Sequence, residues 1–320
     1  MMLVTIFAPG KVHLLEIAGV RDALFEANCK MSSNDAYRVR LVTDTEASKS
    51  VGLAERAIAE KSAPKADVWW GNEVFYTLRL VDEDVLAPYE SPSAADIPAR
   101  YRDPQHRWTG QGLRARVLAF STSTDVQFPP NAESIHVLAD PRLKGKGLIA
   151  RPTAGTTGGH VAALYVLWGD EQADAFFQSL RDNDITVVGG NAIVAQQVGL
   201  GQFLVGLTDN DDVDAVFGTG GRLKMVLPDQ RPDQIGTLTI PTTVGLIKNG
   251  PGNPENAKRL VDYLLSAQVE QMLIERRFAR YSVRAGSSAE GVKAMDVDYN
   301  EVARKMPEAI RRATAILEGR

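Results

Sequence analysis

The chain has 320 residues, 44% of them hydrophobic and 24% charged, and its formal net charge is −4. This composition is that of a globular protein with room for two domains. Lysine and arginine are scattered and no apolar window is long enough to span a membrane, so neither nucleic acid binding nor a membrane-spanning fold is expected. The single cysteine, Cys29, excludes an internal disulfide and a metal site built from several cysteines.

The first part of the chain alternates between strand and helix patterns. Strands are predicted at 4–8, 37–43 and 66–70, and helices at 20–27, at 51–60 and directly after residue 73. Such alternation predicts a parallel sheet covered by helices, in which ligands bind beyond the carboxyl ends of the strands. The polar residues at those ends are Thr45, Glu46, Ser48, Asn72 and Glu73.

A second alternation follows a long surface connection at 88–104 and a strand at 116–122. The predicted strands are 147–150, 185–188 and 203–207, and the predicted helices are 161–168, 171–181 and 192–198. The loops that would face a ligand lie at 153–160, 189–191 and 208–212. A second α/β unit over roughly residues 118–235 is therefore expected.

The stretch from Arg151 to His160 joins the first of these strands to its helix and is rich in small residues. A turn of this kind leaves backbone N–H groups unpaired at the positive end of the helix dipole, which favours an anion. It contains neither a Walker loop nor a dinucleotide fingerprint. An anion site and a plain helix cap both fit this stretch.

The last part of the chain returns to long strand and helix patterns. A β-rich segment covers 236–247, a helix starts after Asn253, and an amphipathic helix covers 299–317. Two strand-like crossings between the α/β units predict a hinged protein that binds its ligand between two lobes. We expect the first lobe to comprise 1–117 with 242–320, and the second to comprise 118–241.

Several motifs in a fixed order carry a family resemblance. They lie at 44–49, 66–73, 139–145, 151–157, 205–212 and 240–247, and are followed by a helix and turn over 256–270. In order and spacing they resemble the periplasmic solute-binding proteins of ABC importers, in the branch that includes ferric-ion-binding proteins. The resemblance implies a bilobal type II fold that closes on its ligand and presents it to a membrane permease. It also implies a monomeric, non-catalytic protein that acts in the periplasm.

The resemblance also indicates where a ligand would bind. In ferric-binding relatives two adjacent tyrosines hold the metal, and the matching positions here are Asp211 and Asp212. A helix N-terminus in the same relatives binds a companion phosphate or carbonate. The positions that match this anion site are Gly155, Thr156, Thr157 and Asn191. The resemblance thus implies an anion site without the phenolate pair.

Two kinds of ligand fit this pattern. One is a zwitterion such as an aminoalkylphosphonate, with its positive group facing Asp209, Asp211, Asp212, Glu46 or Glu73. The other is a metal–anion pair, with Fe(III) or another hard cation held by Glu73, Asp211 and Asp212. The sequence leaves both open.

Simpler structural roles compete with ligand binding at these residues. The aspartates at 209–212 and Glu73 also suit helix N-termini, and Arg114 and Arg116 are expected to form ion pairs between the lobes. His160 has no further histidine at ligand spacing, so a metal role is not expected there.

The alternative function is a metal-dependent phosphohydrolase that uses the Asp209–Asp212 cluster. Against it, the chain has no nucleophile–base spacing, no nucleophile elbow and no His–carboxylate metal motif. The first residues run directly into an apolar strand pattern without the features of a signal peptide. Either the protein is cytosolic, or its export signal is missing from this sequence, and the family resemblance favours a periplasmic protein.

Overall fold

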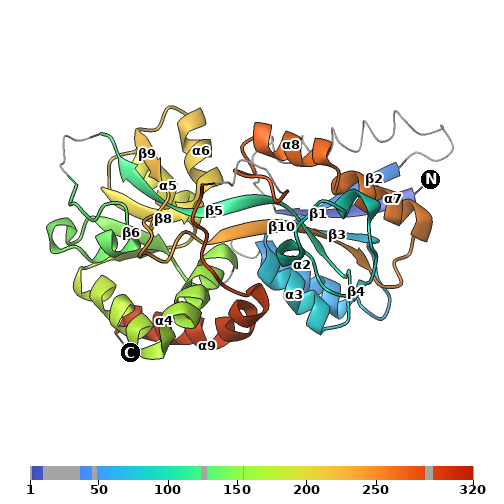
Figure 1. Ribbon diagram of the computed structural model, residues 1–320, viewed down its shortest axis with the longest axis horizontal. Coiled ribbons are helices and arrows are strands. Elements are labelled where there is room, and N and C mark those ends of the chain that lie inside the picture. Colours follow the sequence, from blue (N-terminus) through green and yellow to red (C-terminus); the bar gives the residue numbers. More distant parts are fainter. Residues whose placement is uncertain are drawn as a thin grey trace. The chain divides into compact units, whose positions relative to one another are not determined.

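The computed structural model describes residues 2–9, 37–44, 49–123, 128–153, 155–284 and 291–319, with side chains described from residue 52 onward. The chain forms two compact units (Figure 1). Unit 1 is Met1–Leu113 with Pro241–Glu290, and unit 2 is Arg114–Ile240 with Gly291–Arg320. Within the described ranges, no helix is both long and apolar enough to cross a lipid bilayer.

Unit 1 begins with two strands, and the predicted alternation of helices and strands is seen from residue 49 onward. Its elements before the first crossing are β1 (Met2–Pro9), β2 (Tyr37–Asp44), α2 (Lys49–Ala59), β3 (Val68–Gly71), α3 (Val74–Asp82), β4 (Leu86–Ala87) and the 3-10 helices η1 (Pro92–Ala94) and η2 (Ala99–Tyr101). β1 and β2 are parallel partners. The predicted helix at 20–27 lies outside the described residues.

Two long strands carry the chain between the units. β5 (Thr109–Ser121) contains the boundary at Leu113, and β10 (Thr239–Ile247) contains the boundary at Ile240. The two are neighbours in the sheet, and β10 pairs antiparallel with β3 and β4. After β10, unit 1 is completed by α7 (Pro254–Leu264) and α8 (Ala267–Glu275).

Unit 2 is built on parallel strands separated by helices. Its elements are η3 (Ile135–Ala139), η4 (Pro141–Leu143), β6 (Gly147–Ala150), α4 (Gly155–Asp182), β7 (Thr186–Val188), α5 (Asn191–Gly199), β8 (Val205–Asp209), α6 (Asn210–Gly218), β9 (Leu223–Val226) and α9 (Tyr299–Glu318). β6 pairs parallel with both β7 and β8. β5 pairs antiparallel with β8 and β9. The predicted strand–helix alternation is confirmed here.

Helix α4 explains why two helices were predicted over 161–181. The range consists of two helical segments that meet at Gly169, whose non-helical backbone has φ 75° and ψ 171°, so the predicted division into two helices is confirmed. A positive φ is accessible to glycine without the steric cost that a Cβ brings. The helix also begins earlier than predicted, at Gly155, so the small-residue stretch forms its first turns.

The C-terminal helix α9 lies against α4 in unit 2 (Figure 1). We expected 242–320 to complete the first lobe, but 291–320 group with unit 2 instead. The buried side chains on one stripe of α9 include Val302, Met306 and Ala309. A Cβ at Gly158 of α4 would lie 2.9 Å from the Ile310 side chain, so this glycine permits the close approach of the two helices. Apolar packing onto α4 therefore determines where α9 belongs.

Candidate ligand-binding site

The candidate site lies at one edge of the unit 2 sheet. Strands β7, β6 and β8 are parallel, so their carboxyl ends meet at the same edge. Helices α5, α4 and α6 begin directly beyond these ends. Three helix N-termini therefore face one region, and each has backbone N–H groups without a partner inside its own helix.

Two threonines in the first turn of α4 direct their hydroxyls toward the neighbouring strands and helices. Thr156 Oγ1 donates to Asp209 Oδ2 at 2.6 Å, and Thr157 Oγ1 donates to Asn191 Oδ1 at 3.2 Å. Both threonines are buried, and Gly155 before them has φ 58°. The predicted anion-site residues of this turn are therefore brought next to Asn191 and Asp209.

Asn191 is the first residue of α5 and connects three elements. Its Nδ2 donates to Thr156 Oγ1 at 3.1 Å and to Asp209 Oδ2 at 3.2 Å. Its Oδ1 accepts from Arg116 Nη1 at 3.0 Å. Gly190, which caps α5, has no side chain that could satisfy the first backbone N–H groups of the helix. The start of α5 therefore stays a donor of backbone hydrogen bonds.

Asp209 ends β8 and is held by two arginines of β5. Arg116 is its register partner across the two strands, and Arg116 Nη1 lies 2.6 Å from Asp209 Oδ1. Arg114 Nη2 lies 2.9 Å from Asp209 Oδ2. Burial alone would raise the pKa of Asp209, but the charges of Arg116 and Arg114 outweigh burial and hold it below its usual value. Asp209 is thus an internal counter-charge that is only 2% exposed.

Asp211 shares Arg114 with Asp209. Arg114 Nε and Nη2 both donate to Asp211 Oδ1, at 3.1 and 2.9 Å, and Nη2 also lies 2.9 Å from Oδ2. Burial raises the pKa of Asp211, and the nearby charge of Asp209 raises it further against the opposing effect of Arg114. The pKa of Arg114 is raised because Asp211, Asp209 and Asp212 outweigh the effect of its burial.

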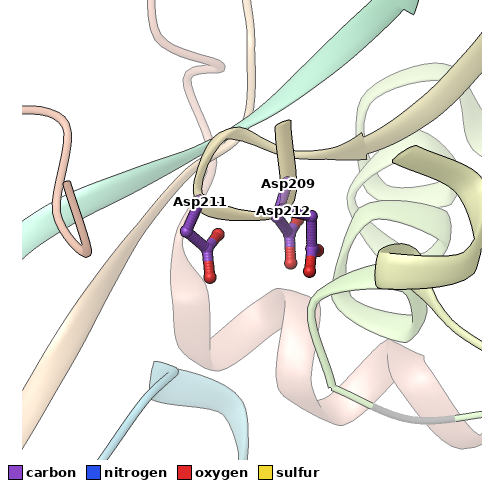
Figure 2. Close-up of side chains that lie close together, drawn as sticks. All are labelled: Asp209, Asp211 and Asp212. Carbon is purple, nitrogen blue, oxygen red and sulfur yellow. The ribbon is translucent and has the colours of Figure 1, made fainter. Parts of the chain in front are cut away.

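The three aspartates lie close enough together to hold a metal ion. One carboxylate oxygen from each of Asp209, Asp211 and Asp212 lies within 4.8 Å of the others. Figure 2 shows all three carboxylates on the same side of the turn between β8 and α6. The cluster predicted from the sequence is therefore brought together by this turn.

Other buried polar groups surround the cluster. His160 on α4 is buried, and its Nε2 has no hydrogen-bond partner among the residues that the structure describes. Its burial, together with the charge of Arg116, lowers its pKa to about 3, so the imidazole is neutral at physiological pH. Asn210 accepts from the Ala115 backbone N–H at 2.7 Å through Oδ1.

The residues predicted in unit 1 have other surroundings. Glu73 is the N-cap of α3: its carboxylate accepts from the backbone N–H groups of Phe75 at 2.7 Å and Tyr76 at 3.1 Å. It is buried, so the structure gives it the role of a helix cap. Asn72 lies in the same short turn between β3 and α3. Thr45, Glu46 and Ser48 lie outside the described residues.

The two arginines of the site have partners other than those predicted from the sequence. Arg114 and Arg116 were expected to pair between lobes, but their partners Asp209 and Asp211 belong to the same unit. A spacing of two residues on a strand places both side chains on one face. Two arginines on one face of the otherwise apolar run 113–120 were the signal that a paired acidic group lay beside them.

The comparison that decides the family covers most of the chain. Residues 63–305 match the bacterial extracellular solute-binding proteins. The chain belongs to this family. Its members are binding proteins, so the phosphohydrolase alternative is not supported.

Individual relatives match most of this chain. An uncharacterized protein of Haemophilus influenzae is 28% identical over 67% of this chain and 62% of its own length. Iron uptake protein A1 of Synechocystis is 24% identical over 82% of this chain and 72% of its own length. This chain thus matches less than two thirds of the length of the Haemophilus relative.

Solved structures give the same fold over nearly the whole chain. The ferric binding protein from Campylobacter jejuni has a TM-score of 0.79 at 19% identity, and 99% of each chain is covered. The periplasmic binding protein AfuA from Actinobacillus pleuropneumoniae, with fructose-6-phosphate bound, has a TM-score of 0.78 at 20% identity and covers 99% of this chain and 98% of its own. The bilobal type II binding-protein fold expected from the sequence is therefore confirmed.

Proposed function

We propose that the protein is the substrate-binding component of an ABC uptake system. It acts as a monomer outside the cytoplasm, binds a small solute through the strand edge of unit 2, and delivers it to a membrane permease. Membership in the extracellular solute-binding family supports the binding role. The absence of a catalytic motif in the sequence agrees with it.

The ligand of this proposal carries an anionic group. The observation that supports an anion is the meeting of the α4 and α5 N-termini at one sheet edge, with Thr157 and Asn191 between them. Backbone N–H groups of two helix starts and the positive ends of two helix dipoles favour a phosphoryl or carboxylate group there. Gly190, the N-cap residue of α5, provides no side-chain cap. The backbone N–H groups at the start of α5 are therefore available to bind the anion.

Two ligand classes fit such an edge. One is Fe(III) or another hard cation bound with a companion anion, as the names of the Synechocystis and Campylobacter proteins indicate for those proteins. The other is an organic anion of the aminoalkylphosphonate type, and the AfuA structure with fructose-6-phosphate shows an organophosphate held by the same fold. For a metal, Asp211 and Asp212 would be the ligands in unit 2.

Thermal unfolding with each ligand class separates the two. Purified protein is melted with Fe(III) plus carbonate or phosphate, with 2-aminoethylphosphonate, and with fructose-6-phosphate. The ligand that binds will stabilise the folded protein by about 2.7 kcal/mol at a hundredfold excess over Kd. If none of these additions raises the melting temperature, the proposal of an anion-binding transport protein of either type is wrong.

A substitution at the helix start connects the binding to this edge. Thr157→Val removes a hydroxyl that donates to Asn191 Oδ1. We expect this variant to bind the ligand roughly tenfold more weakly, which corresponds to the loss of about one hydrogen bond. Thr219→Val is the matched control, because the Thr219 hydroxyl bonds the carbonyl of Val216 at the far end of α6. Equal affinity in both variants would place the ligand elsewhere.

A further inference from the structure

The acidic cluster of unit 2 already contains a cation. Oxygens of Asp209, Asp211 and Asp212 lie within 4.8 Å of one another, a spacing that a hard metal ion could bridge. Arg114 Nη2 lies 2.9 Å from Asp209 Oδ2 and 2.9 Å from each oxygen of Asp211. One guanidinium nitrogen thus bonds two of the three carboxylates at once.

The position of Arg114 is fixed by the sheet. Its backbone belongs to β5, which pairs with the strand that ends in Asp209. Its side chain is 6% exposed, and its Nε makes a further bond to Asp211 at 3.1 Å. To admit a metal ion, the guanidinium would have to leave both aspartates while staying attached to a buried strand, and a buried charge without its partner is strongly unfavourable.

The charges around the cluster are also nearly balanced without a metal. Arg116 pairs with Asp209 at 2.6 Å, and Arg114 pairs with Asp211. A divalent or trivalent ion would add positive charge beside two buried guanidinium groups, and like charges at this distance repel strongly in a low-dielectric interior. The arginines therefore supply the positive charge that a metal would otherwise bring.

We infer that Arg114 occupies the metal position of the Asp209–Asp211–Asp212 cluster and excludes metal ions from it. This inference rests on the proposed function and narrows its ligand: the solute is an organic anion, such as a phosphonate or phosphate ester, and is not a metal–anion pair. Arg114 is in this sense a residue that determines specificity. It determines which ligand binds because it neutralises the carboxylates that a metal ion would need as its ligands.

Titration with a hard cation tests the inference directly. Tb(III) is added to the native protein, to Arg114→Met and to Arg114→Met with Asp211→Asn, and binding is followed by lanthanide luminescence and calorimetry. We expect no saturable binding to the native protein, a gain of at least tenfold in affinity for Arg114→Met, and loss of that gain in the double variant. Arg142→Met is the matched control, because Arg142 pairs with Asp140 away from the cluster.

Two results would overturn the inference. One is stoichiometric binding of Tb(III) or Fe(III) by the native protein that is lost in Asp211→Asn. The other is a folded Arg114→Met that gains no affinity for Tb(III). If Arg114→Met does not fold, the titrations of the native protein and of Asp211→Asn decide alone. Saturable binding of the cation by the native protein that is lost in Asp211→Asn overturns the inference. The absence of saturable binding by the native protein supports it.

The outcome is separate from the test of the proposed function. If no organic anion stabilises the native protein but Arg114→Met acquires a cation site, the exclusion of metal by Arg114 stands and the transport proposal fails. If an organic anion binds and the native protein also binds Tb(III) through Asp211, the transport proposal stands and the role of Arg114 is wrong.

Discussion

Arg116 and Asp209 face each other across β5 and β8, and Arg116 Nη1 donates to Asp209 Oδ1 at 2.6 Å with both side chains almost fully buried. The same arginine nitrogen also reaches Asn191 at the start of α5. Strand pairing thus places one ion pair where it connects β5, β8 and α5. The pair organises the edge at which we place the ligand.

Removal of this arginine is expected to destabilise the protein strongly. Arg116→Met leaves Asp209 buried with one arginine fewer, and breaking a buried pair from one side costs about 3–5 kcal/mol. Urea unfolding followed by circular dichroism measures the change. Lys61→Met is the control, since its pair with Glu83 is exposed and contributes at most about 1 kcal/mol. A similar small loss for both variants would contradict the structural role of the pair.

His160 gives the stability a dependence on pH. Its burial and the charge of Arg116 lower its pKa to about 3, whereas the unfolded chain has a value near 6.5. Between these values the unfolded state binds a proton that the folded state does not, so stability falls as pH falls below about 6.5. The expected slope is about 1.4 kcal/mol per pH unit. His160→Leu should remove this component between pH 6 and pH 4, as judged by urea unfolding at each pH.

His136→Gln provides the comparison for that experiment, because His136 is exposed and stacks on Trp168. A change of slope that appears in both variants would not be specific to the burial of His160. A slope that stays unchanged in His160→Leu would mean that another group carries the proton uptake.

Gly112 is a point where the first crossing strand cannot accept a side chain. Its φ is +59°, and a Cβ would lie 2.7 Å from the Cβ of Ala279. Its N–H also donates to the buried carboxylate of Glu270 at 2.9 Å. Gly112→Ala therefore combines backbone strain with a steric clash, and we expect a loss of about 2–4 kcal/mol in the free energy of unfolding.

Gly145→Ala separates the two effects. Gly145 has φ +69°, but a Cβ there would meet nothing within 4 Å. Gly145→Ala should therefore lower the free energy of unfolding by the backbone strain alone, about 1 kcal/mol. Denaturant unfolding of both variants measures the difference. Equal losses in the free energy of unfolding would show that the contact with Ala279 does not destabilise Gly112→Ala.

Glu73 should behave as a helix cap. Glu73→Ala removes two hydrogen bonds to backbone N–H groups of α3 and is expected to lower stability by about 0.5–2 kcal/mol. Asn253→Ala removes the equivalent cap of α7 and should cost a similar amount. Calorimetric binding of the stabilising solute should be unchanged in Glu73→Ala. A large loss of affinity there would restore Glu73 as a ligand residue.

Much of unit 2 could be predicted because its signals are local. The apolar runs that became β6 and β8 and the small-residue turn that begins α4 are readable from neighbouring residues alone. The two helical segments predicted on either side of Gly169 are both present, and only the way in which Gly169 joins them, with φ 75° and ψ 171°, was not readable from the sequence. Periodicity reports which faces are buried and does not report how consecutive helical segments join.

The charge partners at the site could not be predicted in the same way. Asp209 and Arg116 are neighbours only because β5 and β8 pair in one register, which depends on the whole sheet. The sequence placed Asp209 and Asp211 opposite a cation of the ligand, whereas the protein's own Arg114 lies there. That Asp209, Asp211 and Asp212 lie close together was readable from the sequence, because they fall within four successive positions of the chain.

The packing of α9 against α4 also has a consequence for biosynthesis. Unit 2 takes α9 from a later part of the chain than the residues 241–290 that complete unit 1. Until α9 has been synthesised, the side of α4 around Gly158 is not covered by it. Exposed apolar surface on an incomplete chain favours association with other chains. Unit 2 can therefore reach its final packing only once translation has reached α9, and a chain truncated before Tyr299 would be prone to aggregate.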